Sequence, residues 1–335
     1  MYCCIKPRVS VIVPIYKVEP FIARNAQQLF QQELDQLEYI FVDDCSPDNS
    51  IEVLEQVLSE YPDKRGWTKI IRHPVNKGLP SARNTGLDAA TGEFIFHCDS
   101  DDWLDSDALK KLYNKAKQDN ADAVWCDWYL SFSENERYMR QAPPQEGPIS
   151  GRQCVELMLR GHIRYNVWNK LVRRSLYEQS LIRFPNGYAM GEDMTMISVL
   201  ASAAKVSYLP EALYHYVQLN MGAFTKNTSE LHLRQIRYNV EQTQLALLRK
   251  YGASIMDDIQ FFKLNVKLPF LISQDTQSYQ RWLDWYTEAN DYIPLNPMFG
   301  KRIRFIQYAA IKKQFWILKL HYYLLIRLLY GVIYK

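Results

Sequence analysis

The chain has 335 residues, of which 47% are hydrophobic and 23% charged, and its formal net charge at pH 7 is +3. These values exclude a disordered chain and a small disulfide scaffold, and the length predicts one large domain with an appendage. Residues 292–335 hold eight Lys and Arg and no Asp or Glu, which leaves 32 basic against 37 acidic residues in 1–291. The basic character therefore belongs to the C-terminal segment, and a nucleic-acid partner is not expected.

Cysteine usage and hydropathy bear on the location of the protein. The cysteines show no metal-ligand spacing: Cys3, Cys4, Cys45, Cys98, Cys126 and Cys154. We expect reduced thiols in a cytoplasmic protein, and the N-terminus leads into a strand without an apolar signal segment. No stretch reaches the roughly 18 uncharged apolar residues of a membrane span. The nearest, residues 315–334, is interrupted by Lys319, His321 and Arg327.

Short apolar runs alternate with segments of helical spacing through the first 130 residues. The runs predict strands over residues 9–14, 39–42, 69–72, 93–98 and 123–129. Between them, helices are predicted over residues 20–32, 51–61, 80–90 and 106–120. Strands that alternate with helices at this spacing form βαβ units and a mostly parallel sheet with both faces covered. The expected fold class is therefore α/β.

The second part of the chain is less regular. Residues 131–149 are polar and contain prolines, which predicts a surface loop, and residues 168–175 are expected to pack on the sheet. Helices are predicted over 151–160 and 191–203, and short strands over 206–209 and 213–217. From about Glu230 onward the pattern is helical, with breaks near prolines. We find no internal repeat.

Two of the predicted strands end in acids. Asp43 and Asp44 follow the second strand, and Asp99, Asp101 and Asp102 follow the fourth. Parallel strands share a direction, so both clusters are expected at one sheet edge, where open α/β sheets bind ligands. Like charges so close repel unless a cation offsets them, and such oxygen ligands suit Mg²⁺ or Mn²⁺ with substrate phosphates. The simpler alternatives are a solvated acidic turn for the second cluster and an Asx turn or helix cap for the first.

The same edge receives the loop after the first strand, with Pro14 and Tyr16. An aromatic ring, a carboxylate that accepts from a base N–H and a metal-binding acid cluster together predict a nucleotide diphosphate site. Arg83 lies among small residues in 81–86, which allow close helix–sheet packing and let its planar donors reach a phosphate or ribose; the alternative is a surface ion pair. The chain has no G-x-G-x-x-G or Walker A pattern, which disfavours a dehydrogenase or an ATPase.

The motifs occur in the order found in family 2 glycosyltransferases: residues 11–16, 42–50, 76–78, 82–86, 99–102 and 191–193. The chain resembles this inverting family over roughly residues 8–225, and the segments 168–171 and 214–216 resemble its polysaccharide- and capsule-building members. The resemblance implies the GT-A fold, a Rossmann-like, mostly parallel sheet with helices on both faces. We expect this catalytic domain in 1–225, with nucleotide-sugar binding in 1–130 and the acceptor side in 131–225, and a helical region in 226–335.

The resemblance also implies roles for individual residues. Nucleotide-sugar binding is assigned to Pro14, Tyr16, Asp43, Asp44, Asn76, Arg83, Asp99 and Asp101. Asp44 corresponds to the acid that binds uracil, and the acids expected to bind Mn²⁺ or Mg²⁺ are Asp99, Asp101 and Asp102. Asp193 corresponds to the catalytic base, with Glu192 in a structural part. Two positions depart from the family pattern, since Cys45 stands where glycine is usual and residues 215–222 lack a basic loop rich in serine and glycine.

We therefore expect a metal-dependent inverting glycosyltransferase of the hexosyl- or acetylhexosaminyl-transferase class. It would move a sugar from a UDP-sugar to a hydroxyl of a saccharide or lipid-linked saccharide, in surface polysaccharide or glycolipid synthesis. Asp193 would remove the hydroxyl proton while the cation offsets charge on the leaving diphosphate. The simpler alternative for Asp193 is a helix N-terminal acid. The alternative function is a non-catalytic nucleotide-sugar-binding protein; a nucleotidyltransferase would need a glycine-rich phosphate loop that is missing.

The C-terminal segment 300–335 predicts a basic amphipathic helix. At helical pitch one broad side carries the basic residues Arg302, Arg304, Lys312, Lys313, Lys319 and Arg327. The apolar residues of the helix are Phe305, Ile311, Phe315, Trp316, Leu318, Tyr322, Leu325, Leu329 and Ile333. Such a helix suits the anionic inner surface of a membrane, so we expect a peripheral position on its cytoplasmic face. The alternatives are packing on the catalytic domain and a dimer contact.

Overall fold

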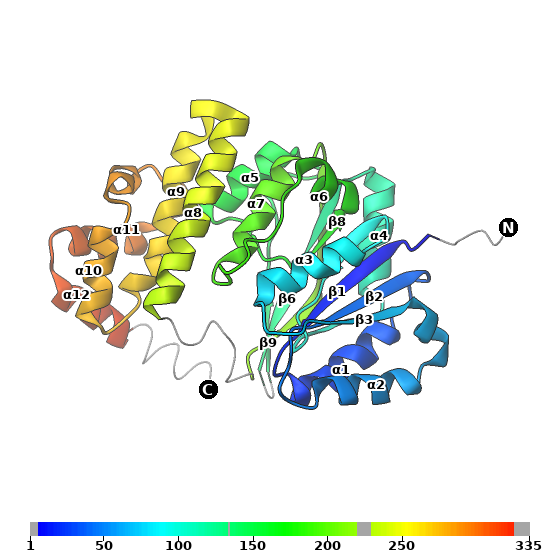
Figure 1. Cartoon of the computed structure of the whole chain (residues 1–335). Coiled ribbons are helices and arrows are strands. Elements are labelled where there is room, and N and C mark those ends of the chain that lie inside the picture. The colour runs from blue at the N-terminus through cyan, green and yellow to red at the C-terminus, as the bar shows by residue number, and fades with distance from the viewer. Residues whose placement is uncertain (1–5, 133–134, 220–228, 325–335) are drawn as a thin grey trace. The chain divides into compact units, whose positions relative to one another are not determined.

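The computed structural model describes residues 6–132, 135–219 and 229–324 (Figure 1). The chain forms two compact units, the first from residues 1–155 with 165–243 and the second from 156–164 with 244–335. The boundary at 243/244 lies inside the long helix α8 (Glu230–Tyr251), later than the boundary at 225/226 that we expected.

The first unit is built on a mixed sheet. Its strands are β1 (Val9–Ile15), β2 (Leu37–Asp43), β3 (Thr68–Arg72), β4 (Phe94–His97), β5 (Trp103–Leu104), β6 (Ala123–Ser131), β7 (Glu136–Met139), β8 (Lys170–Arg173) and β9 (Val206–Val217). They lie in the order β3-β2-β1-β4-β8-β6-β9-β5, with β7 paired to β6. Strands β1, β2, β3, β4, β6 and β9 run in one direction, and β5, β7 and β8 run against it. The expected α/β fold with a mostly parallel sheet is confirmed.

Three segments differ from the sequence prediction. The predicted surface loop 131–149 contains β7, which pairs with the end of β6. The segment 168–175 provides β8, which lies inside the sheet between β4 and β6. The two short strands predicted in 206–217 are one strand, with an irregular register opposite Cys126 and Asp127. Strands β7 and β8 have four residues each, which is too short to show the two-residue hydrophobic alternation of a strand, so the sequence did not predict them.

Helices cover both faces of the sheet. Those of the first part of the chain are α1 (Glu19–Phe30), α2 (Ser50–Ser59), α3 (Leu79–Ala89), α4 (Ala108–Asp119), α5 (Gly151–Arg160), α6 (Arg174–Ser180) and α7 (Thr195–Ala201). Short 3₁₀ turns are η1 (Pro62–Trp67) and η2 (Glu192–Met194), so the helix predicted over 191–203 opens as a 3₁₀ turn. Helices α1 and α2 lie side by side on one face and α3 lies on the other (Figure 1). Helix α1 packs on the sheet through Phe30, whose ring makes edge-to-face contacts with Tyr39 and Phe41 of β2.

Helix α3 packs very closely on β1. A Cβ atom built at Gly86 would lie 2.3 Å from Ile12 Cγ2 and 3.3 Å from Ile12 Cβ. Ile12 is fully buried and branched at Cβ, so it has little room to move. The small residues noted in 81–86 thus allow the close approach that the sequence predicted, and they bring Arg83 of the same helix close to the sheet.

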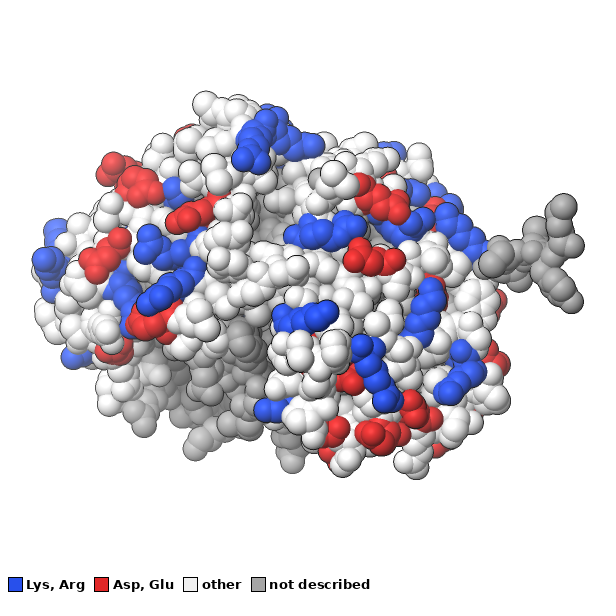
Figure 2. Space-filling view, in the orientation of Figure 1, with Lys and Arg blue, Asp and Glu red and all other residues white. Residues whose placement is uncertain are grey.

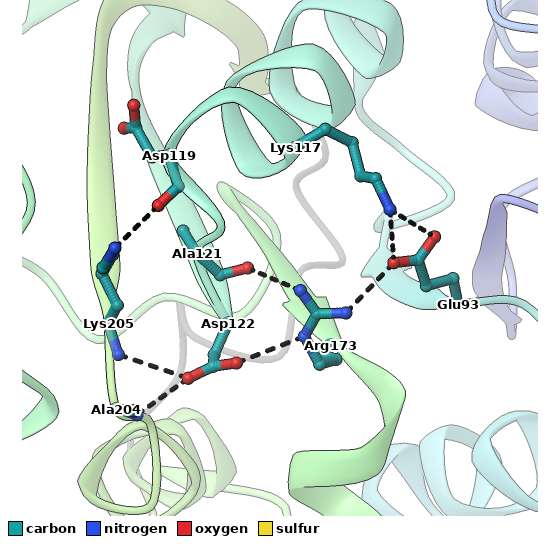
Figure 3. A network of polar contacts seen from close by, with 8 residues as sticks. All are labelled: Glu93, Lys117, Asp119, Ala121, Asp122, Arg173, Ala204 and Lys205. Atoms are coloured by element: carbon teal, nitrogen blue, oxygen red, sulfur yellow. Dashed lines mark hydrogen bonds and ion pairs between the residues drawn. The ribbon is translucent and has the colours of Figure 1, made fainter.

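At the start of the parallel strands, Arg173 fixes the reversed strand β8 (Figure 3). Its guanidinium donates to Glu93 Oε1 at 3.0 Å, to Asp122 Oδ1 at 3.2 Å and to the Ala121 carbonyl at 3.1 Å. The other Asp122 oxygen accepts from the backbone N–H groups of Ala204 and Lys205, just before β9. These contacts join the beginnings of β4, β6 and β9 to the end of β8, at the edge opposite the acid clusters.

The second unit is helical. After α8 it contains η4 (Gly252–Ile255), α9 (Met256–Lys267), η5 (Leu268–Leu271), α10 (Thr276–Asp284), η6 (Thr287–Tyr292), α11 (Lys301–Ile311) and α12 (Phe315–His321). Its core holds Leu264, Leu271, Tyr279, Trp282, Ala289, Ile293, Phe299, Ile306, Ala309, Ala310 and Leu318. On the face shown in Figure 2, acidic and basic side chains are interspersed.

The C-terminal segment differs from the single amphipathic helix that we predicted. It forms α11 and α12 with a turn at Lys312–Gln314, where Lys313 has a φ of 54°. Ile306, Ala309, Ala310 and Leu318 are in the core of the second unit, so packing within that unit, in place of the packing on the catalytic domain named as an alternative, accounts for the inner side of both helices. The expected positions Leu325, Arg327, Leu329 and Ile333 lie outside the described residues.

Because α3 contacts β1 so closely, we expect a larger side chain at Gly86 to destabilise the fold. We expect Gly86→Val to lower the free energy of unfolding by about 2–3 kcal/mol, because the buried Ile12 side chain must move to admit it. Urea denaturation followed by circular dichroism measures this. Gly66→Val is the matched control, since a Cβ there meets nothing within 4 Å, and should change stability by less than about 0.5 kcal/mol. Equal effects of the two substitutions would contradict the packing argument.

Candidate active site

The loops that follow β1 and β2 are tied together at one edge of the sheet. The Asp44 N–H donates to the Ile15 carbonyl at 3.0 Å, and the Lys17 N–H donates to Ser46 Oγ at 2.8 Å. Pro14 is buried at the end of β1, whereas the Tyr16 ring is 43% exposed. The structure thus brings Pro14, Tyr16 and the first acid pair to one place.

The Asp44 carboxylate holds the turn that leads into α3. Its Oδ1 accepts from the Lys77 N–H at 2.8 Å and from His73 Nδ1 at 2.7 Å, and its Oδ2 accepts from the Gly78 N–H at 2.7 Å. The Asn76 side chain donates to the Asp44 carbonyl at 3.2 Å. Asp44 is buried and joins the end of β2 to the helix that carries Arg83, so the two predicted ligand residues are physically linked.

Asp43 has a local structural contact. Its Oδ1 accepts from the Ser46 N–H, three residues on, at 2.8 Å, which is a local contact of the side chain with the backbone, as in the simpler alternatives named above. Asn76 likewise braces the turn through Asp44, although its side chain is exposed. The nucleotide-binding roles expected of Asp43 and Asn76 stay predictions, since these contacts by themselves serve the loops.

Arg83 is the centre of the candidate site. Its side chain is 1% exposed, Nη2 donates to Asp99 Oδ1 at 2.9 Å, and Glu192 Oε1 lies 3.8 Å away. The Phe184 ring centroid lies 5.8 Å from the guanidinium carbon. Asp99, Glu192 and Asp193 all act to keep Arg83 charged, against the effect of burial. The arginine therefore gathers acids from after β4 and from η2, which are far apart in the sequence.

Two buried donors of Arg83 have no partner. Nε and Nη1 make no hydrogen bond within the part of the chain that the structure describes. Unsatisfied buried donors on a charged group are costly, and native proteins seldom leave them so. Their presence beside Asp99 and Asp193 indicates that an anionic or oxygen-rich ligand belongs here.

Glu192 and Asp193 differ in their surroundings. Burial, together with the neighbouring Asp193, raises the pKa of Glu192 to about 8, and Arg83 opposes this. Burial, with Asp99, raises the pKa of Asp193 to about 6, and Arg83 and Lys170 oppose this. Asp193 Oδ1 accepts from the Val167 N–H at 3.2 Å, and Oδ2 accepts no hydrogen bond from the described residues. Asp193 is partly exposed and mostly ionised at neutral pH, which suits a general base.

The acids after β4 divide into two kinds. Asp99, with a side chain 25% exposed, and Asp101 are partly accessible. Asp102 is buried, and both its oxygens accept hydrogen bonds, from Tyr214 Oη at 2.6 Å and from the Val217 N–H at 2.7 Å. Burial and the neighbouring Asp101 and Asp99 raise its pKa. Asp102 thus anchors the acid turn to β9; these contacts are structural by themselves, and the metal-binding role expected of Asp102 stays a prediction.

The fit of the site to a divalent cation follows from these contacts. Among the described residues, no three His, Cys, Asp or Glu side chains converge in a way that would hold a metal ion. Binding of a cation by Asp99, Asp101 and Asp102 together therefore stays a prediction. Mg²⁺ usually binds through one or two carboxylates plus substrate phosphates, and Asp99 and Asp101 fit that smaller requirement.

Three residues that support the site were not found from the sequence. Asn25 on the buried face of α1 donates to the Asp99 and Asp102 carbonyls at 3.0 and 2.9 Å. Tyr214 Oη accepts from the Asp99 N–H at 3.1 Å while it donates to Asp102, and His73 bridges Asp44 and Thr85. Asn25 could have been found from the sequence, because it is a polar residue on the same helix face as the apolar residues Ile22, Ala26 and Leu29.

Comparisons with known proteins agree with this geometry. The model of the family described as "Glycosyl transferase family 2" matches residues 10–186, which include Asp44, Arg83 and the acids after β4. The chain belongs to glycosyltransferase family 2. The Bacillus subtilis protein named "Uncharacterized glycosyltransferase EpsJ" is 31% identical over 276 residues, which cover 80% of this chain and 78% of the relative. The "Cholesterol galactosyltransferase" of Borreliella burgdorferi is 30% identical over 258 residues, which cover 74% and 69%.

Solved structures support the fold. The crystal structure of S. aureus TarS residues 1–349 in complex with UDP-GlcNAc has a TM-score of 0.66 and 19% identity to this family 2 chain, over 94% of the chain and 91% of TarS 1–349. This likeness confirms the GT-A fold predicted from the motifs. The family match and the relatives support a glycosyl transfer role.

The contacts of Asp102 predict a stability role. Asp102→Ala would leave the Tyr214 hydroxyl and the Val217 N–H without an acceptor in the interior, so we expect the free energy of unfolding to fall by about 2–4 kcal/mol. Chemical denaturation measures this. Asp107→Ala, which removes a surface ion pair with Lys111, is the control and should cost less than about 0.5 kcal/mol. A stability loss at Asp102 no larger than at Asp107 would contradict this stability role.

Proposed function

We propose that this glycosyltransferase uses a UDP-sugar and transfers the sugar with inversion to a hydroxyl of a saccharide or lipid-linked saccharide, in surface polysaccharide or glycolipid synthesis. The observation that carries the proposal is the buried Arg83, which holds Asp99 beside Glu192 and Asp193 and keeps two donors unpaired among the described residues. A site that combines carboxyl groups with unused guanidinium donors suits a ligand that brings both a cation and a diphosphate.

The nucleotide half of the donor would lie at the ends of β1 and β2. A carboxylate offers about four acceptor positions, and three of those on Asp44 are occupied, so one is left for a base N–H. The exposed Tyr16 ring on the neighbouring loop offers an apolar surface for the base or ribose. The TarS structures with UDP-GlcNAc and with UDP support a uridine donor in this fold.

The diphosphate would lie near Asp99, Asp101 and Arg83. We propose that Asp99 and Asp101 hold Mn²⁺ or Mg²⁺ together with the phosphates, and the bound cation would offset the charge that grows on the departing UDP. The unpaired Nε and Nη1 of Arg83 would donate to the same diphosphate or to the ribose. Asp102 stays behind this turn and keeps it in position.

The acceptor side would be governed by Asp193. Its Oδ1 is fixed by the Val167 N–H, and Oδ2 would accept the proton of the acceptor hydroxyl as oxygen attacks the anomeric carbon. The carbon–UDP bond breaks on the opposite face, which gives inversion. Since burial raises the pKa of Asp193 to about 6, the base is deprotonated above that pH and basic enough to take the proton.

The assignment predicts a specific loss in Asp193→Asn. We expect turnover to fall by about 10²–10⁴-fold, because the amide cannot accept the proton, while UDP binding stays within about twofold. UDP release from a panel of UDP- and GDP-sugars with Mn²⁺ and a saccharide acceptor measures turnover, and calorimetry measures UDP affinity.

The control for that experiment is Asp88→Asn, an exposed acid on α3 paired only with Arg183 at 3.4 Å among the described residues. It should keep turnover. Full activity of Asp193→Asn would overturn the base assignment. UDP binding without turnover by the unmodified protein, for every donor and acceptor tried, would instead favour the non-catalytic nucleotide-sugar-binding protein.

We also propose a peripheral position on the cytoplasmic face of the inner membrane, through α11 and α12. Among the described residues no helix is long and apolar enough to cross a bilayer. The outer sides of the two helices expose Phe305 by 58%, Trp316 by 67% and Leu320 by 49%. Lys301, Lys312, Lys313 and Lys319 are exposed beside them. Aromatic and basic side chains without acids suit anionic headgroups.

Membrane binding by these helices predicts a sharp effect of two point changes. Trp316→Ser with Leu320→Ser should lower flotation of the protein with anionic phosphatidylglycerol vesicles by about tenfold, since each removes apolar contact with the interface. Leu181→Ser, at a leucine 81% exposed in the first unit, is the control and should float as before. Equal flotation of all three proteins, or equal binding to neutral vesicles, would remove the membrane proposal.

A further inference from the structure

Lys170, the first residue of β8, is a buried cation, and lysine is seldom buried in proteins. It is 1% exposed, and burying a lysine is unfavourable unless its ammonium is well satisfied. Its Nζ donates to the Asn166 carbonyl at 2.7 Å and to Asn169 Oδ1 at 2.6 Å. Both acceptors belong to the segment just before β8, so the ammonium draws that segment into a compact turn.

This turn contains the group that holds the proposed base. Val167 lies between the two acceptors of Lys170, and its N–H donates to Asp193 Oδ1. The far end of the turn is fixed to β6, because Asn169 Nδ2 donates to the Cys126 carbonyl at 2.9 Å and the Cys126 N–H donates to the Asn169 carbonyl at 3.1 Å. A continuous set of contacts thus runs from the sheet, through Lys170, to the base.

The charge of Lys170 acts on the same carboxylate. Burial lowers the pKa of Lys170 to about 8, and Cys154, Asp193 and Cys126 oppose this. Burial raises the pKa of each of the two thiols to about 12, so both stay uncharged near neutral pH. Burial and Asp99 raise the pKa of Asp193, whereas Arg83 and Lys170 favour its ionised form. Lys170 is therefore a buried cation whose charge acts on Asp193.

We propose that Lys170 is a positioning residue for glycosyl transfer: its ammonium shapes the turn 166–169, and this turn orients Asp193 through the Val167 N–H. The inference rests on the proposed role of Asp193 as base. Lys170 touches neither donor nor acceptor in this scheme, so its effect reaches the reaction only through the Val167 N–H and the electrostatic field at Asp193.

The second unit offers a matched control. Lys267 is also fully buried, its Nζ donates to the Trp285 carbonyl at 2.8 Å and to Asn290 Oδ1 at 2.7 Å, and burial lowers its pKa to about 8. It shares the burial, the type of acceptors and the charge of Lys170, but its contacts serve only the helical core. Lys267→Met therefore measures what losing a buried structural lysine does to the enzyme.

The test is the pH dependence of turnover in the full-length protein with its best UDP-sugar and Mn²⁺. For the unmodified protein we expect kcat to rise with pH through about 6, where Asp193 loses its proton. Lys170→Met removes the cation, so this rise should move up by about one pH unit. At pH 6 the ionised fraction of Asp193 would then fall from about one half to about one tenth. Lys267→Met should leave the rise where it is, and UDP affinity should stay within about twofold in both variants.

A second variant and a measurement on the unmodified protein cover the case in which Lys170→Met does not fold. Asn169→Asp keeps the size of the side chain and gives Lys170 an ion-pair partner, but it loses the donation to the Cys126 carbonyl. The added negative charge should raise the pKa of Asp193, so the pH rise should move in the same direction. In the unmodified protein, the amide NMR resonance of Val167 should titrate with the midpoint of the activity profile, because its N–H is bound to Asp193.

The outcomes separate this inference from the proposed function. An unchanged pH rise in Lys170→Met or Asn169→Asp, or a Val167 resonance that does not titrate, overturns the positioning role while leaving Asp193 as base. An unmodified protein that transfers no sugar from any donor overturns the proposed function itself. A fall in kcat equal in Lys170→Met and Lys267→Met, with no pH shift in either, assigns Lys170 to folding alone and contradicts the proposal.

Discussion

The burial of Arg83 is the constraint on which the site depends. A charged guanidinium that is 1% exposed must be surrounded by opposite charge, and the chain supplies Asp99 from the end of β4 and Glu192 and Asp193 from η2. Arg83 reaches these acids because α3 lies so close to β1, which in turn requires Gly86. One packing contact between a helix and a strand thus sets the place where the acids of the candidate site meet.

The sheet topology makes that meeting possible. Parallel strands β1, β2 and β4 bring their ends, and the acids after them, to one edge. The reversed strand β8 continues the sheet and delivers the turn 166–169 to the same edge, since it starts there and ends at the Arg173 network on the opposite side. The fold therefore positions Asp193 through two independent routes, the electrostatic one from Arg83 and the backbone one from Val167.

Much of this could be predicted from the sequence, because Asp44, Arg83, Asp99 and Asp193 stand in motifs with a fixed order and strands followed by acids have a known geometry. The different contacts of the individual acids after β4 could not be predicted from the sequence. Whether Asp102 faces a cation or Tyr214 depends on where β9 passes, and β9 is more than a hundred residues away from it in the chain. The burial of Lys170 could not be predicted either, because the strands β4 and β6 on either side of β8 lie far away in the chain. Strands β7 and β8 have four residues each, which is too short to show the two-residue hydrophobic alternation of a strand. The C-terminal helix was predicted as one exposed element because amphipathic spacing does not show which side a neighbouring helix will cover.

A crystal structure of the chain with UDP and Mn²⁺ would test the central claim most directly. The account predicts that UDP lies along the ends of β1, β2 and β4, with its base near Asp44 and its diphosphate within reach of the unpaired Arg83 nitrogens. Mn²⁺ should contact Asp99 or Asp101, Asp102 should keep its bonds to Tyr214 and Val217, and Asp193 should face the end of the diphosphate where the sugar would be attached. UDP bound at another edge of the sheet, or Arg83 still without a ligand when UDP is bound, would contradict it.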